Sequence, residues 1–336
     1  MPGPIRLEGR ALTMDLEYSH EWFEFTREMN ALDRRLYKEK MDHDTEETVR
    51  SEYRTCLYKR YEHRSEFIGE RKKELVEDME ELTGTHLEFH LQYQPTQYVT
   101  VRCPKDKLAF DVVDEVRVSS AAKRHFESQG YDVAILAKSS SSRGMVRIAD
   151  IYGELRGADA EGHEATHLIL DGTPLQNAYH QDEARIICDT ACDIVGAERL
   201  QYYVEKHYSS DEKMVERMDH LLHFKENSVK LIGEARDEIL PFIEAGDKKG
   251  ADAVVEKYSA LSDEVLGQHL EINRCIMAVA HIYSGNKEVK GALETLKDER
   301  GVAGMLEAVK EITTIDELLD EAYDDPGIAK REEPES

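Results

Sequence analysis

Apolar residues recur at helical spacing in two long stretches of this chain, and a segment with a two-residue period separates them. In residues 14–82, glycine and proline are almost absent, and the spacing of Trp22, Phe25 and Met29 is typical of a helix face that is buried. Residues 86–151 instead contain alternating and β-branched runs that are typical of strands. Helical spacing returns from residue 181. This order predicts a predominantly helical α+β protein with a small β-sheet between two helical arms.

The first arm is predicted to be a long antiparallel helical hairpin. The segment Asp42-His43-Asp44-Thr45 interrupts the helical pattern, and the acidic residues that follow it are typical of a new helix start. Gly84 is expected to end the second helix. The middle segment is predicted to contain strands at 86–91, 98–101, 132–137 and 145–148, a helix at 119–129 and a loop at 139–144.

The second arm is predicted to be a helical bundle. Its helices are expected at 181–208, 211–244 with a kink at Pro241, 248–283 and 287–312. We divide the chain into an N-terminal helical hairpin (1–84), a central α+β unit (85–209), a C-terminal helical bundle (210–323) and a disordered acidic tail (324–336). The apolar stripe from Trp22 to Tyr61 is expected to pack either inside the protein or against a partner subunit.

Composition excludes several classes of partner. Acidic residues number 70 against 44 lysines and arginines, which gives a formal charge of −26, so binding to nucleic acid would oppose the overall field and is not expected. No apolar run approaches 18 residues and no export signal is visible, so we expect a cytoplasmic protein that does not enter a membrane. The five cysteines form no C-x-x-C pair and are expected to be reduced.

The segment His163-Glu164-Ala165-Thr166-His167 has the pattern H-E-x-x-H. Residues four apart lie on one face of a helix, so His163 and His167 can bind one metal ion while Glu164 leans toward it. Zinc in hydrolases takes three protein ligands and keeps one position open for water, whose pKa it lowers to about 7. The motif therefore predicts a Zn²⁺ site with Glu164 as general base.

The order of elements around the motif resembles a known superfamily. A strand hairpin, a helix with H-E-x-x-H and a second helix with an acidic ligand form the core of the zinc peptidases called zincins, and residues 130–205 resemble that core. The run from His163 to Leu170, followed by Asp182 and Glu183, is similar to the ImmA/IrrE family of metallopeptidases. This resemblance implies that Glu183 is the third zinc ligand and that the helical arms recognise one partner protein.

The segment from Gly172 to His180 is also similar to the G-T-x-x-D-x-x-Y-G signature of the aspzincins, a group that includes lysine-specific endopeptidases. Its Gly, Thr and Tyr are present, but Gln176 stands where the ligand aspartate belongs and His180 replaces the last glycine. A neutral amide is a poor zinc ligand beside a carboxylate or an imidazole. We therefore expect Glu183 as the third ligand, with His180, Asp182 and Gln176 as alternatives.

Further residues are expected to support the reaction. Tyr179 is expected to donate a hydrogen bond to the developing tetrahedral oxygen, and His180 and His207 are alternatives for this role. Asp189 and Asp193 lie on the helix that follows, where they can accept hydrogen bonds from the second ring nitrogens of the metal-binding histidines. Other polar or thiol pairs are expected to be structural: His86 with His90, His220 with His223, and Cys188 with Cys192.

The sequence therefore predicts a zinc-dependent metallopeptidase that hydrolyses peptide bonds in a protein or peptide substrate, with zinc as its single cofactor. The alternative is a structural, assembly or interaction protein, for example a virion component, whose H-E-x-x-H run is accidental or inactive. Metal content distinguishes the two, because a zinc enzyme is expected to purify with about one zinc ion per chain.

Overall fold

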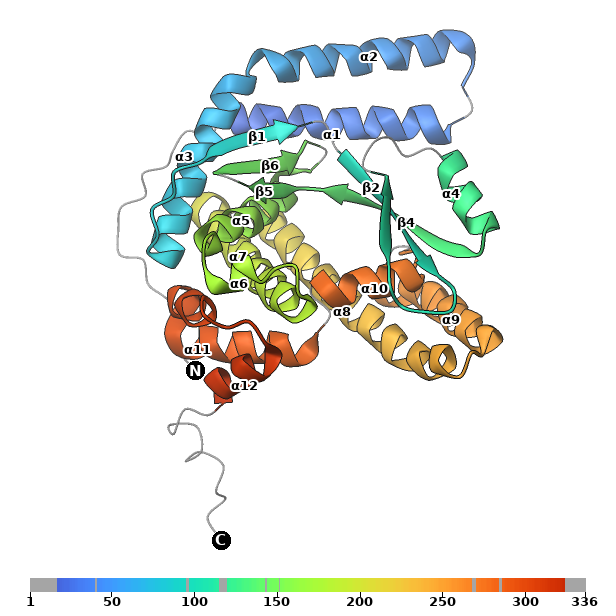
Figure 1. Cartoon of the computed structure of the whole chain (residues 1–336). Helices are drawn as coiled ribbons and strands as arrows, with labels where there is room; N and C mark the ends of the chain where they lie inside the picture. The colour runs from blue at the N-terminus through green and yellow to red at the C-terminus, as the bar shows by residue number, and fades with distance from the viewer. Residues whose placement is uncertain are drawn as a thin grey trace.

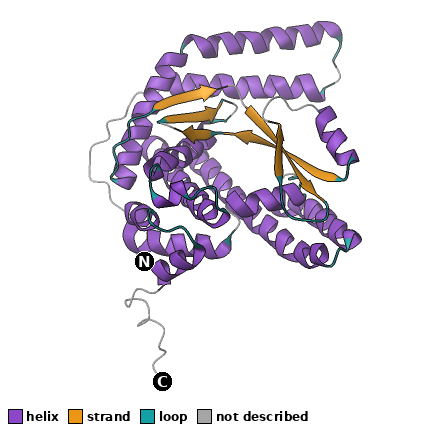
Figure 2. Ribbon diagram, viewed as in Figure 1, coloured by secondary structure: helices purple, strands orange, loops and turns teal. Residues whose placement is uncertain are grey.

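The computed structural model describes residues 17–323, apart from residues 40, 95–96, 115–119, 143, 151, 268–269 and 284–285. In that part of the chain, helices surround two small sheets (Figures 1 and 2). The predicted class, a predominantly helical α+β protein, is confirmed. The tail at 324–336, which the sequence predicts to be disordered, lies outside the described residues.

The N-terminal arm contains three helices: α1 (Glu17–Lys38), α2 (His43–Glu62) and α3 (Arg64–Thr83). Helices α1 and α2 run side by side along one edge of the molecule, and α3 continues from α2 at an angle (Figure 1). The break at Asp42 is confirmed as a helix start, because its carboxylate accepts a hydrogen bond of 2.8 Å from the backbone N–H of Thr45. Gly84 ends α3 in the left-handed conformation, as expected.

The strands form two three-stranded sheets instead of one. In the first, β1 (His90–Gln94) lies parallel to β6 (Met145–Ala149), which pairs antiparallel with the edge strand β5 (Ser140–Ser142). In the second, β2 (Gln97–Pro104) lies between β3 (Asp111–Asp114) and β4 (Tyr131–Lys138), all antiparallel. The short helix α4 (Ser120–Ser128) contacts β4. The prediction of a loop at 139–144 was wrong at β5, because serine gives little indication of a strand.

The remaining helices lie beneath and beside the sheets (Figure 1). They are α5 (Glu154–Leu170), α6 (Pro174–Asn177), α7 (Asp182–Tyr208), α8 (Glu212–Glu244), α9 (Lys248–Leu266), α10 (Arg274–Tyr283), α11 (Lys287–Val309) and α12 (Ile315–Tyr323). The single helix predicted at 248–283 was wrong, because Gly267 ends α9 with a φ of 64°. Pro241 lies inside α8. Among the described helices, none is both long and apolar enough to cross a membrane.

The largest hydrophobic cluster joins elements from both arms. It includes Phe67 of α3, Ile148 of β6, Leu170 of α5, Ile187 of α7 and Leu293 of α11, all fully buried. Helices α8, α9 and α10 share a separate cluster. The predicted boundaries after residues 84 and 209 therefore do not coincide with the edges of the main core.

Two glycines allow α5 and α7 to approach closely. A Cβ atom on Gly196 would lie 2.7 Å from the backbone oxygen of Asp159, and one on Gly162 would lie 3.0 Å from the Cβ of Arg199. Because residues three, four and seven apart share a helix face, the face of α7 that contains Gly196 also carries Asp189 and Asp193. The close contact of the two helices thus brings these carboxylates to the H-E-x-x-H face of α5.

Candidate metal centre

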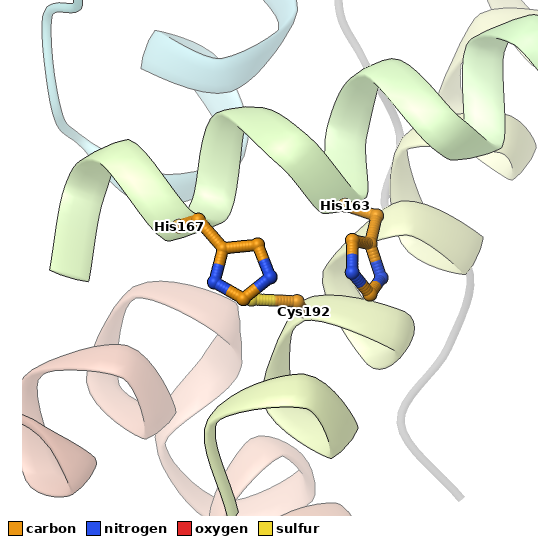
Figure 3. Close-up of side chains that lie close together, drawn as sticks. All are labelled: His163, His167 and Cys192. Atoms are coloured by element: carbon orange, nitrogen blue, oxygen red, sulfur yellow. The ribbon is translucent and has the colours of Figure 1, made fainter. Parts of the chain in front are cut away.

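The two histidines of the motif project from α5 toward α7 (Figure 3). Their ring centroids are 5.1 Å apart, and both side chains are largely buried. This arrangement follows from the spacing of four residues on one helix. The prediction that His163 and His167 lie together on one helix face is confirmed.

Asp189 of α7 lies between the histidines and completes a set of three donors. Its Oδ1 is 3.2 Å from Nε2 of His167 and 4.0 Å from Nε2 of His163. The Tyr179 hydroxyl lies 2.9 and 3.1 Å from the two carboxylate oxygens and holds Asp189 in place. Tyr179 thus lies at the site, as expected, but its hydroxyl donates to a carboxylate, and its predicted role in the transition state stays a prediction.

The second ring nitrogens of both histidines also have partners. Nδ1 of His163 is 2.9 Å from Oδ1 of Asp193, so the expected hydrogen bond to the following helix is present. Nδ1 of His167 instead lies 3.6 Å from Sγ of Cys188, which donates to the side-chain oxygen of Gln176 at 3.2 Å. Such partners fix the orientation of each imidazole and direct Nε2 toward Asp189, where a metal ion would be bound.

Cys192 lies at the same centre, although the sequence indicated only a core residue. One nitrogen of each histidine and the Cys192 sulfur lie within 4.8 Å of one another (Figure 3). Both residues are almost fully buried, but Asp189 lines the cleft beside the histidines and Cys192 does not. The cleft gives water and substrate a route to the histidines. Asp189 therefore fits the third ligand of a catalytic site better than Cys192 does.

Glu164 faces the same cleft and is largely buried. Only 7% of the residue is exposed. Burial raises the pKa of Glu164 above its usual value, although the nearby His163 and His167 and a hydrogen bond to Ser141 oppose the shift. Ser141 belongs to the edge strand β5, so the strand that the sequence missed is part of this site.

The carboxylates around the histidines favour positive charge. Burial lowers the pKa of His167, but Asp189 and Cys188 outweigh this effect and raise it to about 11. At His163, burial likewise acts against Asp193, and the pKa is raised. A divalent cation can replace the two protons that such a site attracts. Two imidazoles and a carboxylate are also a donor set that zinc prefers, so the residues present fit this metal.

The centre lies in a cleft of about 610 Å³, which is the size of an ordinary ligand pocket. One side is formed by α5 with the H-E-x-x-H motif, and strand β5 forms part of the rim. Tyr179 and Asp189 line it from the α6–α7 region. The second sheet and α10 provide a further wall.

Other residues predicted for the site lie elsewhere. Glu183 is exposed, and its carboxylate accepts a hydrogen bond of 2.9 Å from the backbone N–H of Ile315 at the start of α12. The structure therefore does not bring Glu183 to the histidines. His180 and Asp182 are also exposed. Gln176 lines the cleft but bonds to Cys188, and His207 is paired with Glu74 in a buried network.

The sequence does contain information about Asp189, namely its angular position around the axis of the helix. Asp189 lies six positions after Glu183, which places them about 120° apart around an α-helix. Gly162 and Gly196 mark the contact between α5 and α7, and Asp189 lies two turns before Gly196 on the same face. This angular position assigns Asp189, and not Glu183, to the side that faces the motif.

Comparisons with models of protein families, with curated protein sequences and with solved structures found no match. The function of the centre must therefore be inferred from its geometry and donor chemistry.

Proposed function

We propose that this chain is a zinc-dependent peptidase in which His163, His167 and Asp189 hold the metal. One observation carries the proposal: Asp189 Oδ1 lies 3.2 and 4.0 Å from the two Nε2 atoms. Ligands about 2.0 to 2.2 Å from a tetrahedral zinc ion are separated from one another by about 3.4 Å. The three donors could therefore bind one zinc ion after small side-chain movements.

Zinc at this position would polarise a carbonyl group and lower the pKa of water. Glu164 would act as general base by taking a proton from the attacking water and would later pass it to the leaving amine. Burial of Glu164 supports this role, because its raised pKa brings it closer to that of the groups with which it exchanges protons. Asp193 would hold His163 in the orientation that presents Nε2 to the metal.

The edge strand β5 supports a peptide as the substrate. In the sheet order β1-β6-β5, one edge of β5 has no partner strand among the described residues. Ser140 and Ser141 line the cleft beside Glu164. An extended peptide can add to such an edge through main-chain hydrogen bonds, which would place its backbone carbonyl groups near the metal.

Metal analysis of the purified protein tests the proposal first. We expect about one zinc ion per chain, removable by a chelator, and a large loss of zinc in His163→Ala and His167→Ala. A folded wild-type protein that takes up no zinc from a buffered solution would rule out the peptidase and leave the interaction protein as the explanation.

Glu164→Gln tests the mechanism separately from metal binding. Because Glu164 is not a ligand, the variant should keep its zinc while its hydrolysis of labelled, denatured casein falls by about 10²- to 10⁴-fold. Equal rates in the variant and the wild type would show that another group acts as the base.

A further inference from the structure

Opposite the histidines, the cleft has an apolar wall that the H-E-x-x-H motif does not explain. This wall consists of side chains from the second sheet and α10: Val99, Val101, Phe110, Val112, Leu136 and Val279. Strand pairing places four of them on one face of the sheet. Val99 lies opposite Leu136, Val101 lies opposite Val112, and Val99 and Val101 are two residues apart.

Helix α10 covers only part of this face. Val101 is 2% exposed and packs near Cys275 of α10. Val99 and Leu136 are half-buried, and Val112 is 54% exposed. The apolar face therefore continues past α10 into the cleft, where it ends at an exposed valine. Apolar surface beside a polar catalytic group is typical of a pocket that binds an apolar part of a ligand.

The polar part of the same cleft contains four acidic side chains, together with Arg156, Lys225 and the two histidines. Asp159, Glu164, Asp189 and Asp193 line it, and Lys225 is bound to Asp159 at 2.7 Å. The formal charge of −26 of the whole chain would oppose the approach of an acidic substrate side chain. A large apolar side chain would instead bury surface against the valines and Leu136.

We propose that the cleft selects peptides with a large apolar side chain, such as leucine or phenylalanine, next to the bond that is cleaved, with the exposed Val112 wall as the determinant of this preference. The inference rests on the proposed peptidase function for its reaction, but peptide binding tests it independently of hydrolysis.

Blocked hexapeptides of alanine and glycine that carry one variable residue provide the probe. Their binding is measured by calorimetry to zinc-treated Glu164→Gln protein, in which cleavage is suppressed. We expect the leucine and phenylalanine peptides to bind at least about tenfold more tightly than the glycine and aspartate peptides. Equal affinities for the four peptides, or no binding of any of them, would overturn the proposal.

Val112→Asp, made in the Glu164→Gln background, tests the wall itself. Val112 lies on a short, exposed edge strand, so the change should not prevent folding. Val265→Asp is the matched control, because Val265 is 44% exposed on α9 and does not line the cleft. We expect the preference for leucine to fall at least about fivefold in Val112→Asp and to persist in Val265→Asp. The same preference in both variants would overturn the assignment of the wall.

Peptidase activity is judged on other measurements, namely the zinc content and the casein hydrolysis of the wild type. Selective binding of apolar peptides without hydrolysis would reject the proposed function and keep the apolar site. Hydrolysis of peptides without any preference for apolar residues would support the proposed function and reject the apolar site.

Discussion

Helix α5 carries charged clusters on two sides, and they differ in charge balance. On the side that faces away from the cleft, Glu161 is fully buried between Arg71 and Arg199. Its Oε2 lies 2.5 Å from Nη2 of Arg71 and 2.8 Å from Nη1 of Arg199. On the side that faces the cleft, Glu164 lies beside two imidazoles, Asp189 and Asp193. One side of α5 thus belongs to a buried charge network, and the other side lines the cleft.

The buried cluster contains its own counter-charges. Three acids face three cationic side chains, and His207 also pairs with Glu74: the other members are Asp78, Glu161, Arg71, Arg199 and Lys206. The Tyr93 hydroxyl also donates to Glu161. Pairing with opposite charges reduces the cost of burying these groups. The cluster therefore fixes α3, α5 and α7 relative to one another.

The cleft cluster contains more acid than base. Glu164, Asp189 and Asp193 surround His163 and His167, which carry positive charge only when protonated. A bound cation would offset the negative charge of this centre. The buried cluster thus carries its own counter-charges, whereas the carboxylates beside the two histidines outnumber them at the border of a cleft.

The largest effect is expected for Asp189→Asn, which replaces the proposed ligand carboxylate with an amide of the same shape. Zinc affinity should fall by about 10³-fold, because an amide is a poor zinc ligand and the centre loses a negative charge. Competition with a chromogenic chelator measures the change, and thermal unfolding of the metal-free protein checks that the fold is kept.

Glu183→Gln is the matched control, since it makes the same chemical change on the same helix. Its carboxylate binds the Ile315 N–H, so zinc affinity should change less than about twofold. If Glu183→Gln loses zinc and Asp189→Asn keeps it, the sequence-based assignment of the third ligand would be restored and the one made from the structure would be rejected.

These two carboxylates also show what the sequence could predict. The motif alone places His163 and His167 together, because one helix fixes their relation. The third ligand comes from another helix, and its identity depends on the rotation of α7 about its axis. The sequence favoured Glu183 because of a family resemblance. In the structure, the contact at Gly162 and Gly196 sets the rotation of α7 and turns Asp189 toward the motif.

Local patterns predicted some helix ends, although the stop at Gly267 was missed, and strands that depend on distant pairing were predicted poorly. The start of α2 at Asp42 follows from a side chain that bonds within its own turn. Strand β5 was missed because its three serines become a strand only by pairing with β6. The apolar wall at Val112 likewise depends on cross-strand pairing within the second sheet.

A smaller effect is expected in the buried cluster from Glu74→Gln. Burial raises the pKa of Glu74, but Arg71 and His207 outweigh burial and lower it from 4.5 to about 2. Because the folded-state pKa lies below the unfolded-state value, this carboxylate stabilises the protein above about pH 4.5. That contribution is lost as the pH falls from 4.5 to 2.

Glu74→Gln should lower the free energy of unfolding at pH 6 by about 3 kcal/mol, and the difference from wild type should shrink toward pH 3. Urea denaturation of the chelator-treated proteins at several pH values measures this, and removal of the metal keeps the cleft cluster from contributing zinc-dependent stability. A difference that stays constant across this range would mean that Glu74 is not ionised in the folded protein.

The smallest effect is expected for Asp193→Asn. This variant tests whether a negative charge in the cleft strengthens zinc binding by way of its hydrogen bond to a histidine ligand. Asp193 accepts a hydrogen bond from Nδ1 of His163 at 2.9 Å, and an amide oxygen can still accept that bond without the negative charge. Zinc affinity should therefore weaken by about 10- to 100-fold.

Asp159→Asn is the control for Asp193→Asn, because Asp159 lines the same cleft but is bound to Lys225. If charge acts only through the histidine, Asp159→Asn should leave zinc affinity within about twofold of wild type. Equal losses in the two variants would show that the cleft attracts zinc through its total charge. The distinction between the two sides of α5 would then depend on net charge alone, and not on a positioned pair of imidazoles and carboxylates.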